Sequence, residues 1–172
     1  MAYTKHRTFR EYVKALYWRH ERPLPLGPNL KAGMGAIAGV AMVGSLATLT
    51  GLPLLLAPFG ATSALLFGRP TSSLAQPINV MGGYLIATVA CDAAFFLFPH
   101  AWLAAAVAVG LAVMVMRWAR VTHPPACAMP ILGYDANFHG IELFATVFVG
   151  AVLLITLALL VHRIPPRRRY PL

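Results

Sequence analysis

Long apolar runs in this chain alternate with short stretches broken by proline and glycine. A helix that crosses a membrane needs about 20 mostly apolar residues. Four runs reach or approach that length, at residues 32–56, 78–98, 101–119 and 141–161. The pattern predicts an all-α membrane protein with four transmembrane helices.

Two shorter apolar stretches lie between these runs. Residues 59–68 are too few to cross a membrane, and a second short stretch follows His123-Pro124-Pro125. Proline lacks an amide hydrogen and disfavours helix in the residue before it, so each stretch begins as a new short helix. Irregular backbone at membrane depth is tolerated only inside protein or beside a water-filled cavity. We therefore expect two re-entrant or half helices, the second of which is the first candidate for a transport or ligand site.

The two short stretches resemble each other in their arrangement. When residues 58–68 are placed over residues 123–133, two positions are identical, and small residues face small ones at most others. Each stretch also lies between two long runs. We infer a parallel internal repeat, in which each copy consists of a span, a short helix and a span. Chance similarity also explains two identities, so that alternative stays open.

The remaining segments divide the chain further. Residues 1–22 are basic with apolar residues at helical spacing, which predicts an amphipathic interfacial helix, although a solvated basic tail fits too. Residues 23–31 form a proline-rich linker, residues 32–163 the transmembrane domain, and residues 164–172 a basic C-terminal tail.

Composition and charge strengthen the membrane assignment. The chain is 59% hydrophobic and 11% charged, whereas soluble domains are roughly 45–50% apolar and 25% charged. The net charge of +9 comes mainly from cations in the two termini. That clustering favours anionic lipids over nucleic acid and predicts two cytoplasmic termini in a bacterial inner membrane. Cys91 and Cys127 lie in apolar surroundings and are expected to be reduced.

The short helices suggest an anion site. Amides at residues 60–63 and 126–128 lack intrahelical acceptors, and the helix dipole adds roughly half a positive charge there. Three cations, Arg69, Arg117 and Arg120, follow or precede these segments. We expect them on the outer side, against the usual preference of positive charge for the cytoplasm. The expected anion-binding or pathway residues are His123, Pro124, Pro125, Arg120, Arg117, Arg69, Gly60, Thr62, Ser63, Asn79 and Asp92.

Several roles remain open for the titratable residues. His123 fits a neutral donor to an anion, a proton carrier, or a helix-end histidine bonded to a carbonyl. Together with Cys127 and Met129 it also offers Cu(I) ligands. Asp92 at membrane depth needs a partner, expected to be an internal arginine, and also fits proton-coupled movement. No cofactor, resident metal or catalytic pattern is expected, so the protein is not expected to be an enzyme.

Particular motifs resemble the HPP family of integral membrane proteins. They are the triplet His123-Pro124-Pro125, residues 57–63, residues 66–67 and residues 75–83, in that family's order. The resemblance covers about residues 33–161 and implies a four-span membrane domain. Plastid and cyanobacterial members are linked to nitrite transport, which agrees with an anion path.

The expected function is therefore a small transporter or channel for a monovalent inorganic anion, nitrite first. The competing class is a membrane scaffold or assembly module without transport activity. Glycine-rich helix faces suggest a homo-oligomer, with a dimer as the simplest form.

Overall fold

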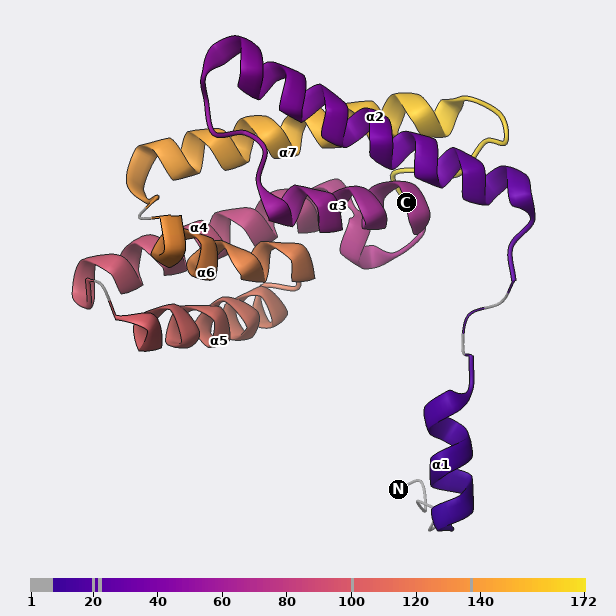
Figure 1. Cartoon of the computed structure of the whole chain (residues 1–172), viewed down its shortest axis with the longest axis horizontal. Helices are drawn as coiled ribbons and strands as arrows, with labels where there is room; N and C mark the ends of the chain where they lie inside the picture. Colours follow the sequence, from indigo (N-terminus) through magenta and orange to yellow (C-terminus); the bar gives the residue numbers. More distant parts are fainter. Residues whose placement is uncertain (1–7, 20, 22, 100, 137) are drawn as a thin grey trace.

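The computed structural model describes residues 8–19, 21, 23–99, 101–136 and 138–172, and in these residues all regular structure is helical. The α-helices are α1 (Phe9–Tyr17), α2 (Leu26–Thr50), α3 (Ala57–Gly68), α4 (Pro77–Leu97), α5 (Trp102–Trp118), α6 (Met129–Ala136) and α7 (Gly140–Arg163). Two short 3-10 helices are η1 (Ser73–Ala75) and η2 (Pro124–Ala128). Helices α2 to α7 form one bundle, from which α1 projects (Figure 1).

Prolines begin the helices that were expected to start at them. Pro58 lies in the first turn of α3, Pro77 opens α4, and Pro124 and Pro125 open η2. The first amides of a helix have no intrahelical acceptor, so proline loses nothing at these positions. The prediction of two short helices between long ones is therefore confirmed for residues 57–68 and 124–136.

Helix α2 starts earlier than the first apolar run suggested. It begins at Leu26 and includes Pro28 in its first turn, so the extended linker is shorter than residues 23–31. It ends at Gly51, which has φ of 72° in the left-handed region that glycine adopts without strain. Residues 51–56 then lead without regular secondary structure to α3.

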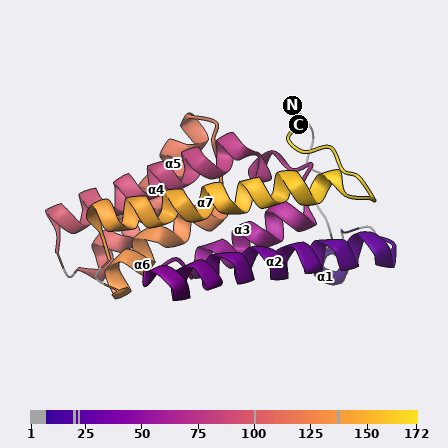
Figure 2. The same cartoon turned by 90° about the horizontal axis from the view of Figure 1, so that it is seen from above.

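The direction of the chain differs from the expected repeat. We call the end of the bundle where α2 begins and α7 ends the terminus end, and the opposite end the far end. Helix α3 runs back from the far end to the terminus end, so α2 and α4 run in the same direction (Figures 1 and 2). Helices α5, α6 and α7 repeat this order in the opposite sense. The expected parallel orientation is wrong, because α3 runs opposite to α2, so that α2 and α4 point the same way.

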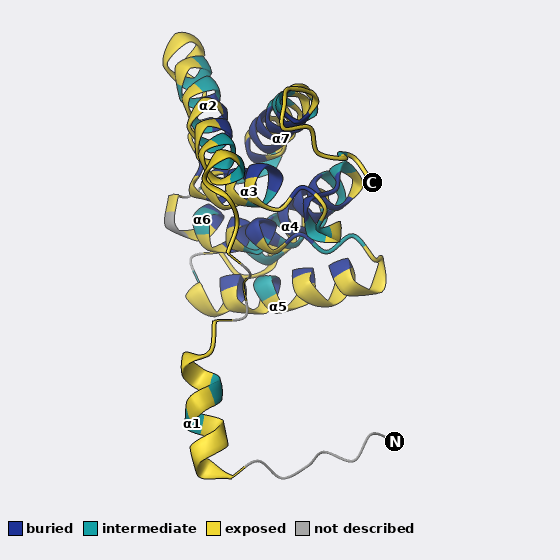
Figure 3. Cartoon of the chain, turned by 90° about the vertical axis from the view of Figure 1, so that its right-hand side faces the viewer, coloured by how far each residue is buried: buried dark blue, intermediate teal, exposed yellow. Residues whose placement is uncertain are grey.

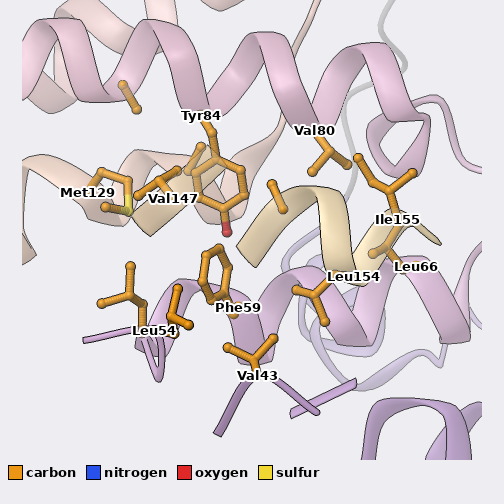
Figure 4. Packing of buried hydrophobic residues seen from close by; sticks show 14 of the residues in the cluster. Val43, Leu54, Phe59, Leu66, Val80, Tyr84, Met129, Val147, Leu154 and Ile155 are labelled. Atoms are coloured by element: carbon orange, nitrogen blue, oxygen red, sulfur yellow. The ribbon is translucent and has the colours of Figure 1, made fainter. Parts of the chain in front are cut away.

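Helix α3 lies at the centre of the packing (Figure 3). A Cβ on Gly35 of α2 would stand 2.6 Å from the ring of Phe67, and one on Gly150 of α7 would stand 2.2 Å from the ring of Phe59. These glycines let both neighbouring helices approach α3 closely, so this part of the glycine-rich face of α2 packs within the chain. Figure 4 shows Phe59 among the buried side chains of the surrounding helices.

Three helices of the described chain are long and apolar enough to cross a membrane, namely α2, α4 and α7. Helix α5 is apolar but has only 17 residues. Helix α1 has a Thr8–Glu11 capping box and no buried residue. Its apolar side chains Phe9, Leu16 and Tyr17 are exposed, as expected of a helix whose apolar face is covered by something other than this bundle.

Candidate functional site

A buried chain of hydrogen bonds joins the two broken segments. His123, which precedes η2, is 0% exposed. Its Nδ1 lies 2.8 Å from the carbonyl oxygen of Leu74, and its Nε2 lies 2.9 Å from Oγ1 of Thr62 in α3. Oγ1 of Thr62 is also 2.7 Å from the hydroxyl of Tyr84 in α4. The two broken segments therefore meet inside the protein.

The partners fix the direction of each hydrogen bond. A carbonyl oxygen only accepts, so His123 Nδ1 carries a hydrogen and donates to Leu74. In a neutral imidazole Nε2 then accepts, and the hydroxyl of Thr62 donates to it. Oγ1 of Thr62 in turn accepts from the hydroxyl of Tyr84. With neutral His123 every polar atom of the chain has a partner.

This arrangement bears on two of the roles that the sequence left open for His123, the donor to an anion and the metal ligand. A donor to an anion needs a free N–H, but the only one on neutral His123 is already bonded to Leu74. A metal needs a nitrogen lone pair, but Nε2 accepts from Thr62. The geometry therefore matches the histidine bonded to a carbonyl, and it links α3, α4 and η2.

The other polar candidates near this chain have separate surroundings. Asn79 Nδ2 donates to the carbonyl of Thr122 over 3.2 Å and so steadies the backbone before His123. Ser63 is fully buried, and its hydroxyl has no hydrogen-bond partner in the described residues. It faces Gly39, where an added Cβ would stand 3.3 Å from Oγ. Gly60 is exposed at the start of α3.

The prolines of the triplet differ in burial, because Pro125 is buried while Pro124 is exposed. Both lie in the first turn of η2, where they set the start of the helix. Their role in the structure is therefore to begin η2, since α5 has already ended at Trp118.

The three internal arginines do not converge on this chain of hydrogen bonds. Arg69, Arg117 and Arg120 are all exposed. Arg69 forms an ion pair with Glu21 of the N-terminal linker. The expectation that Arg69 lies opposite the termini is wrong, because α3 carries it back to the terminus end. Helix α5 runs in that direction too (Figure 1), and Val121, which follows Arg120, packs on Gly82 near the start of α4.

Arg120 occupies an unusual backbone position. Its φ is 62°, and it is the only non-glycine residue in the described chain with a positive φ. The amide of Val121 bonds to the carbonyl of Met116 over 2.9 Å, and that of Arg120 to the carbonyl of Arg117 over 3.2 Å. This pair of bonds is the Schellman motif, in which glycine usually holds the left-handed position. Arginine therefore closes α5 with a strained residue.

Asp92 lies toward the far end of α4 and has a backbone partner. Its Oδ1 accepts from the amide of Gly140 over 2.8 Å and so caps the start of α7. The expected arginine partner is wrong, because the internal arginines lie toward the terminus end. A cavity lined by Asp92, Phe95 and His139 opens beside it, and the Phe95 and His139 rings stack with centroids 3.7 Å apart.

A polar cavity lies at the terminus end, among α2, the end of α3, the end of α7 and the C-terminal tail. Its volume is about 910 Å³. Its charged and titratable lining residues are Glu21, Lys31, Arg69, His162 and Arg168. It lies at the C-terminal end of α3, away from the amides at residues 60–63 that were expected to hold an anion.

Sequence reasoning missed four of these residues, namely Glu21, Lys31, His162 and Arg168. Lys31 and Arg168 belong to the basic segments at opposite ends of the sequence, and their cluster forms only when α2 and the tail meet. Lys31 Nζ donates to the carbonyls of Ile164 and Pro166, which fixes the tail beside α2. His162 stands at the end of a long apolar run, and this position was the signal available for it.

The described chain forms a bundle of apolar helices, and three of them are long enough to cross a bilayer. Two further segments inside the bundle are short helices that begin at prolines. These features define a transmembrane protein. The chain belongs to the family described as HPP, transmembrane region, whose model matches residues 22–171. This confirms the resemblance carried by the His123-Pro124-Pro125 triplet.

Two transmembrane proteins of Dictyostelium discoideum are similar to this chain. One is 30% identical over 129 residues, covering 70% of this chain and 45% of the relative. The other is 32% identical over 125 residues, covering 68% of this chain and 40% of the relative. The chain thus spans less than half the length of these relatives. No solved structure matches it.

Proposed function

We propose that this protein transports a small monovalent inorganic anion, with nitrite as the first substrate to test. The observation that carries the proposal is the cavity of about 910 Å³, lined by Lys31, Arg69 and Arg168 at the end of an otherwise apolar bundle. Low-dielectric walls lined by one sign of charge focus the electric field and concentrate the opposite ion. Glu21 offsets part of this charge through its ion pair with Arg69.

A route inward from the cavity follows α3. Ala64 and Leu65 line the cavity, and the buried hydroxyl of Ser63 precedes them without a partner in the described residues. That hydroxyl is an unpaired donor that reaches an anion once α2 and α3, which pack closely here, move apart. The two three-helix halves run in opposite senses, as the inverted repeats of many secondary transporters do. That similarity is one of architecture, so the chemistry of the cavity bears the argument.

The same proposal covers location and partners. We infer a bacterial inner membrane with both termini in the cytoplasm, since the internal arginines and the basic termini then share the positive side. Anionic lipid headgroups would contact both basic segments. Exposed apolar faces of α2 and α5 suit lipid or a second copy of the chain, with a dimer as the simplest closed form.

Uptake into liposomes tests the proposal. Purified protein is reconstituted, and entry of nitrite and of nitrate is measured against protein-free vesicles. Lys31→Gln and Arg168→Gln each remove a cation from the cavity, so we expect each to lower the initial rate about tenfold, equivalent to roughly 1.4 kcal/mol. Arg117→Gln is the matched control, because Arg117 is exposed at the end of α5 and does not line this cavity.

The variants separate a cavity effect from general loss of charge. Rates that fall equally in the cavity variants and in Arg117→Gln would point to surface charge and contradict the proposed role of the cavity. Because Lys31 also holds the tail, Lys31→Arg is a second control that keeps both a cation and a donor. Uptake indistinguishable from empty vesicles would reject transport of these two anions.

A membrane scaffold is the second candidate, and two observations favour it. The polar atoms of the His123, Thr62 and Tyr84 chain are satisfied by one another, so this part of the interior needs no ligand. Helix α1 also presents apolar side chains that the bundle does not cover. A scaffold predicts no uptake in liposomes but retained membrane association and folding.

A further inference from the structure

His162 closes the C-terminal end of α3. Its Nε2 lies 2.8 Å from the carbonyl oxygen of Leu66, and it must donate because that oxygen only accepts. In a continuing helix that carbonyl would accept from the amide four residues later, but Pro70 has no amide hydrogen. The imidazole therefore supplies the donor that Pro70 lacks.

The second ring nitrogen of His162, Nδ1, does not take part in this cap. The residue is 3% exposed and lines the cavity, and its Nδ1 has no hydrogen-bond partner in the described residues. With Nε2 protonated, Nδ1 of the neutral ring holds a lone pair. A proton added there would give a charged imidazole beside the cavity.

The groups that face His162 determine how unfavourable protonation of Nδ1 is. Lys31 from α2 and Arg168 from the tail bring positive charge to it, and its own helix ends at Arg163. From α3 the neighbouring side chain is the uncharged Phe67 ring. Tyr170 from the tail packs against the imidazole, and burial raises the pKa of its phenol, which therefore stays neutral.

Across the cavity Arg69 and Glu21 neutralise each other. A further positive charge beside Lys31 and Arg168 is unfavourable when the cavity holds only water, because like charges oppose each other. A bound anion reverses this balance.

We propose that His162 takes up one proton when an anion enters this cavity, so that the anion and a proton move together. The proton comes from solution and forms a bond with Nδ1, while the bound anion adds one negative charge. The net charge of the loaded cavity therefore equals that of the empty one. This inference rests on the proposed function and names the proton as the ion coupled to anion transport.

Liposome uptake under controlled pH and voltage tests the coupling. Nitrite uptake by the wild type should rise with an inward proton gradient and should not respond to a membrane potential set by potassium and valinomycin, because one anion and one proton carry no net charge. Protein-free vesicles give the leak of nitrous acid, which is subtracted. The external pH stays near 7, above the ordinary histidine pKa of about 6.5, so that a free imidazole starts neutral.

His162→Gln is the informative variant, because glutamine keeps an N–H donor for Leu66 but binds no proton. We expect it to retain uptake, to lose the response to the proton gradient and to become sensitive to potential. His139→Gln is the matched control at the far end and should behave as the wild type. A structural cap alone would change the rate without changing the driving force.

Failure of the coupling and failure of the proposed function would give different results. Wild-type uptake that follows the potential and ignores the proton gradient overturns the coupling but leaves transport intact, and this result does not depend on the folding of any variant. His162→Gln protein that still couples uptake to protons also overturns it. Wild-type vesicles that take up no nitrite beyond the leak reject the proposed function itself.

Discussion

The hydroxyl of Thr62 is the point at which the buried hydrogen-bond chain is most sensitive. Thr62→Val preserves the shape of the side chain but removes the bonds to both His123 and Tyr84. Interhelical hydrogen bonds inside membrane proteins contribute about 0.6 kcal/mol on average and up to about 1.7. Losing two should therefore lower the free energy of unfolding by about 1–3 kcal/mol.

Tyr84→Phe is the comparison variant for Thr62→Val, because the two substitutions should lower the free energy of unfolding by different amounts. It removes one bond and leaves Thr62 donating to His123, so its cost should be about 0.6–1.7 kcal/mol. In the Tyr84→Phe background, Thr62→Val has one bond left to break and should cost about half as much as it does alone. Thr62→Ser keeps the hydroxyl and controls for changes at the site that leave the bonds intact.

Thermal unfolding of the purified protein in detergent measures these differences. For a chain of this size a change of 1 kcal/mol shifts Tm by about 2–4 °C. Equal costs for Thr62→Val and Tyr84→Phe, or costs that add without coupling, would refute the arrangement of one hydroxyl shared between two partners. A double-mutant cycle of the two substitutions gives the coupling directly.

Three other predictions concern packing, capping and strain. Gly150→Ala should lower the free energy of unfolding by about 1–3 kcal/mol, because its Cβ would meet the ring of Phe59, whereas Gly110→Ala, with nothing within 4 Å, should be neutral in the same thermal assay. Asp92→Ala should lower the free energy of unfolding by about 0.5–2 kcal/mol, because it removes the cap of α7. Asp92→Asn keeps an acceptor oxygen and should unfold like the wild type. An equally large loss of stability in both variants would show that the charge matters and not the cap. Arg120→Gly should raise the free energy of unfolding by about 1 kcal/mol, measured as a higher Tm, and a lower Tm would show that the Arg120 side chain contributes more than its left-handed backbone costs.

The apolar pattern predicted the helical class and the places where helices restart. Prolines opened α3, α4 and η2 as expected, because a missing amide hydrogen acts locally and does not depend on distant residues. The His123-Pro124-Pro125 triplet likewise predicted the family from neighbouring residues, without knowledge of the fold. Glycine-rich faces suggested a homo-oligomer, whereas Gly35 packs against Phe67 of the same chain.

Chain direction was the main feature that the sequence predicted wrongly. A short apolar helix between two long ones fits both a segment that dips and returns and a segment that continues across. Residues 51–56 decide between these possibilities, because they turn the chain back from the end of α2 toward α3 (Figure 1). The wrong choice placed Arg69 on the opposite side from the termini and gave the repeat a parallel orientation.

The sequence by itself determined the helices, their breaks and the clustering of cations at the two ends of the chain, since each depends on the local chemistry of neighbouring residues. Only the tertiary structure decided which polar groups meet. Asp92 contacts an amide 48 residues away, and His162 contacts a carbonyl 96 residues away. Such pairs depend on how the helices pack, and packing is a property of the whole bundle. The cavity that joins Lys31 to Arg168 has the same origin, which is why neither residue was a candidate before the fold was known.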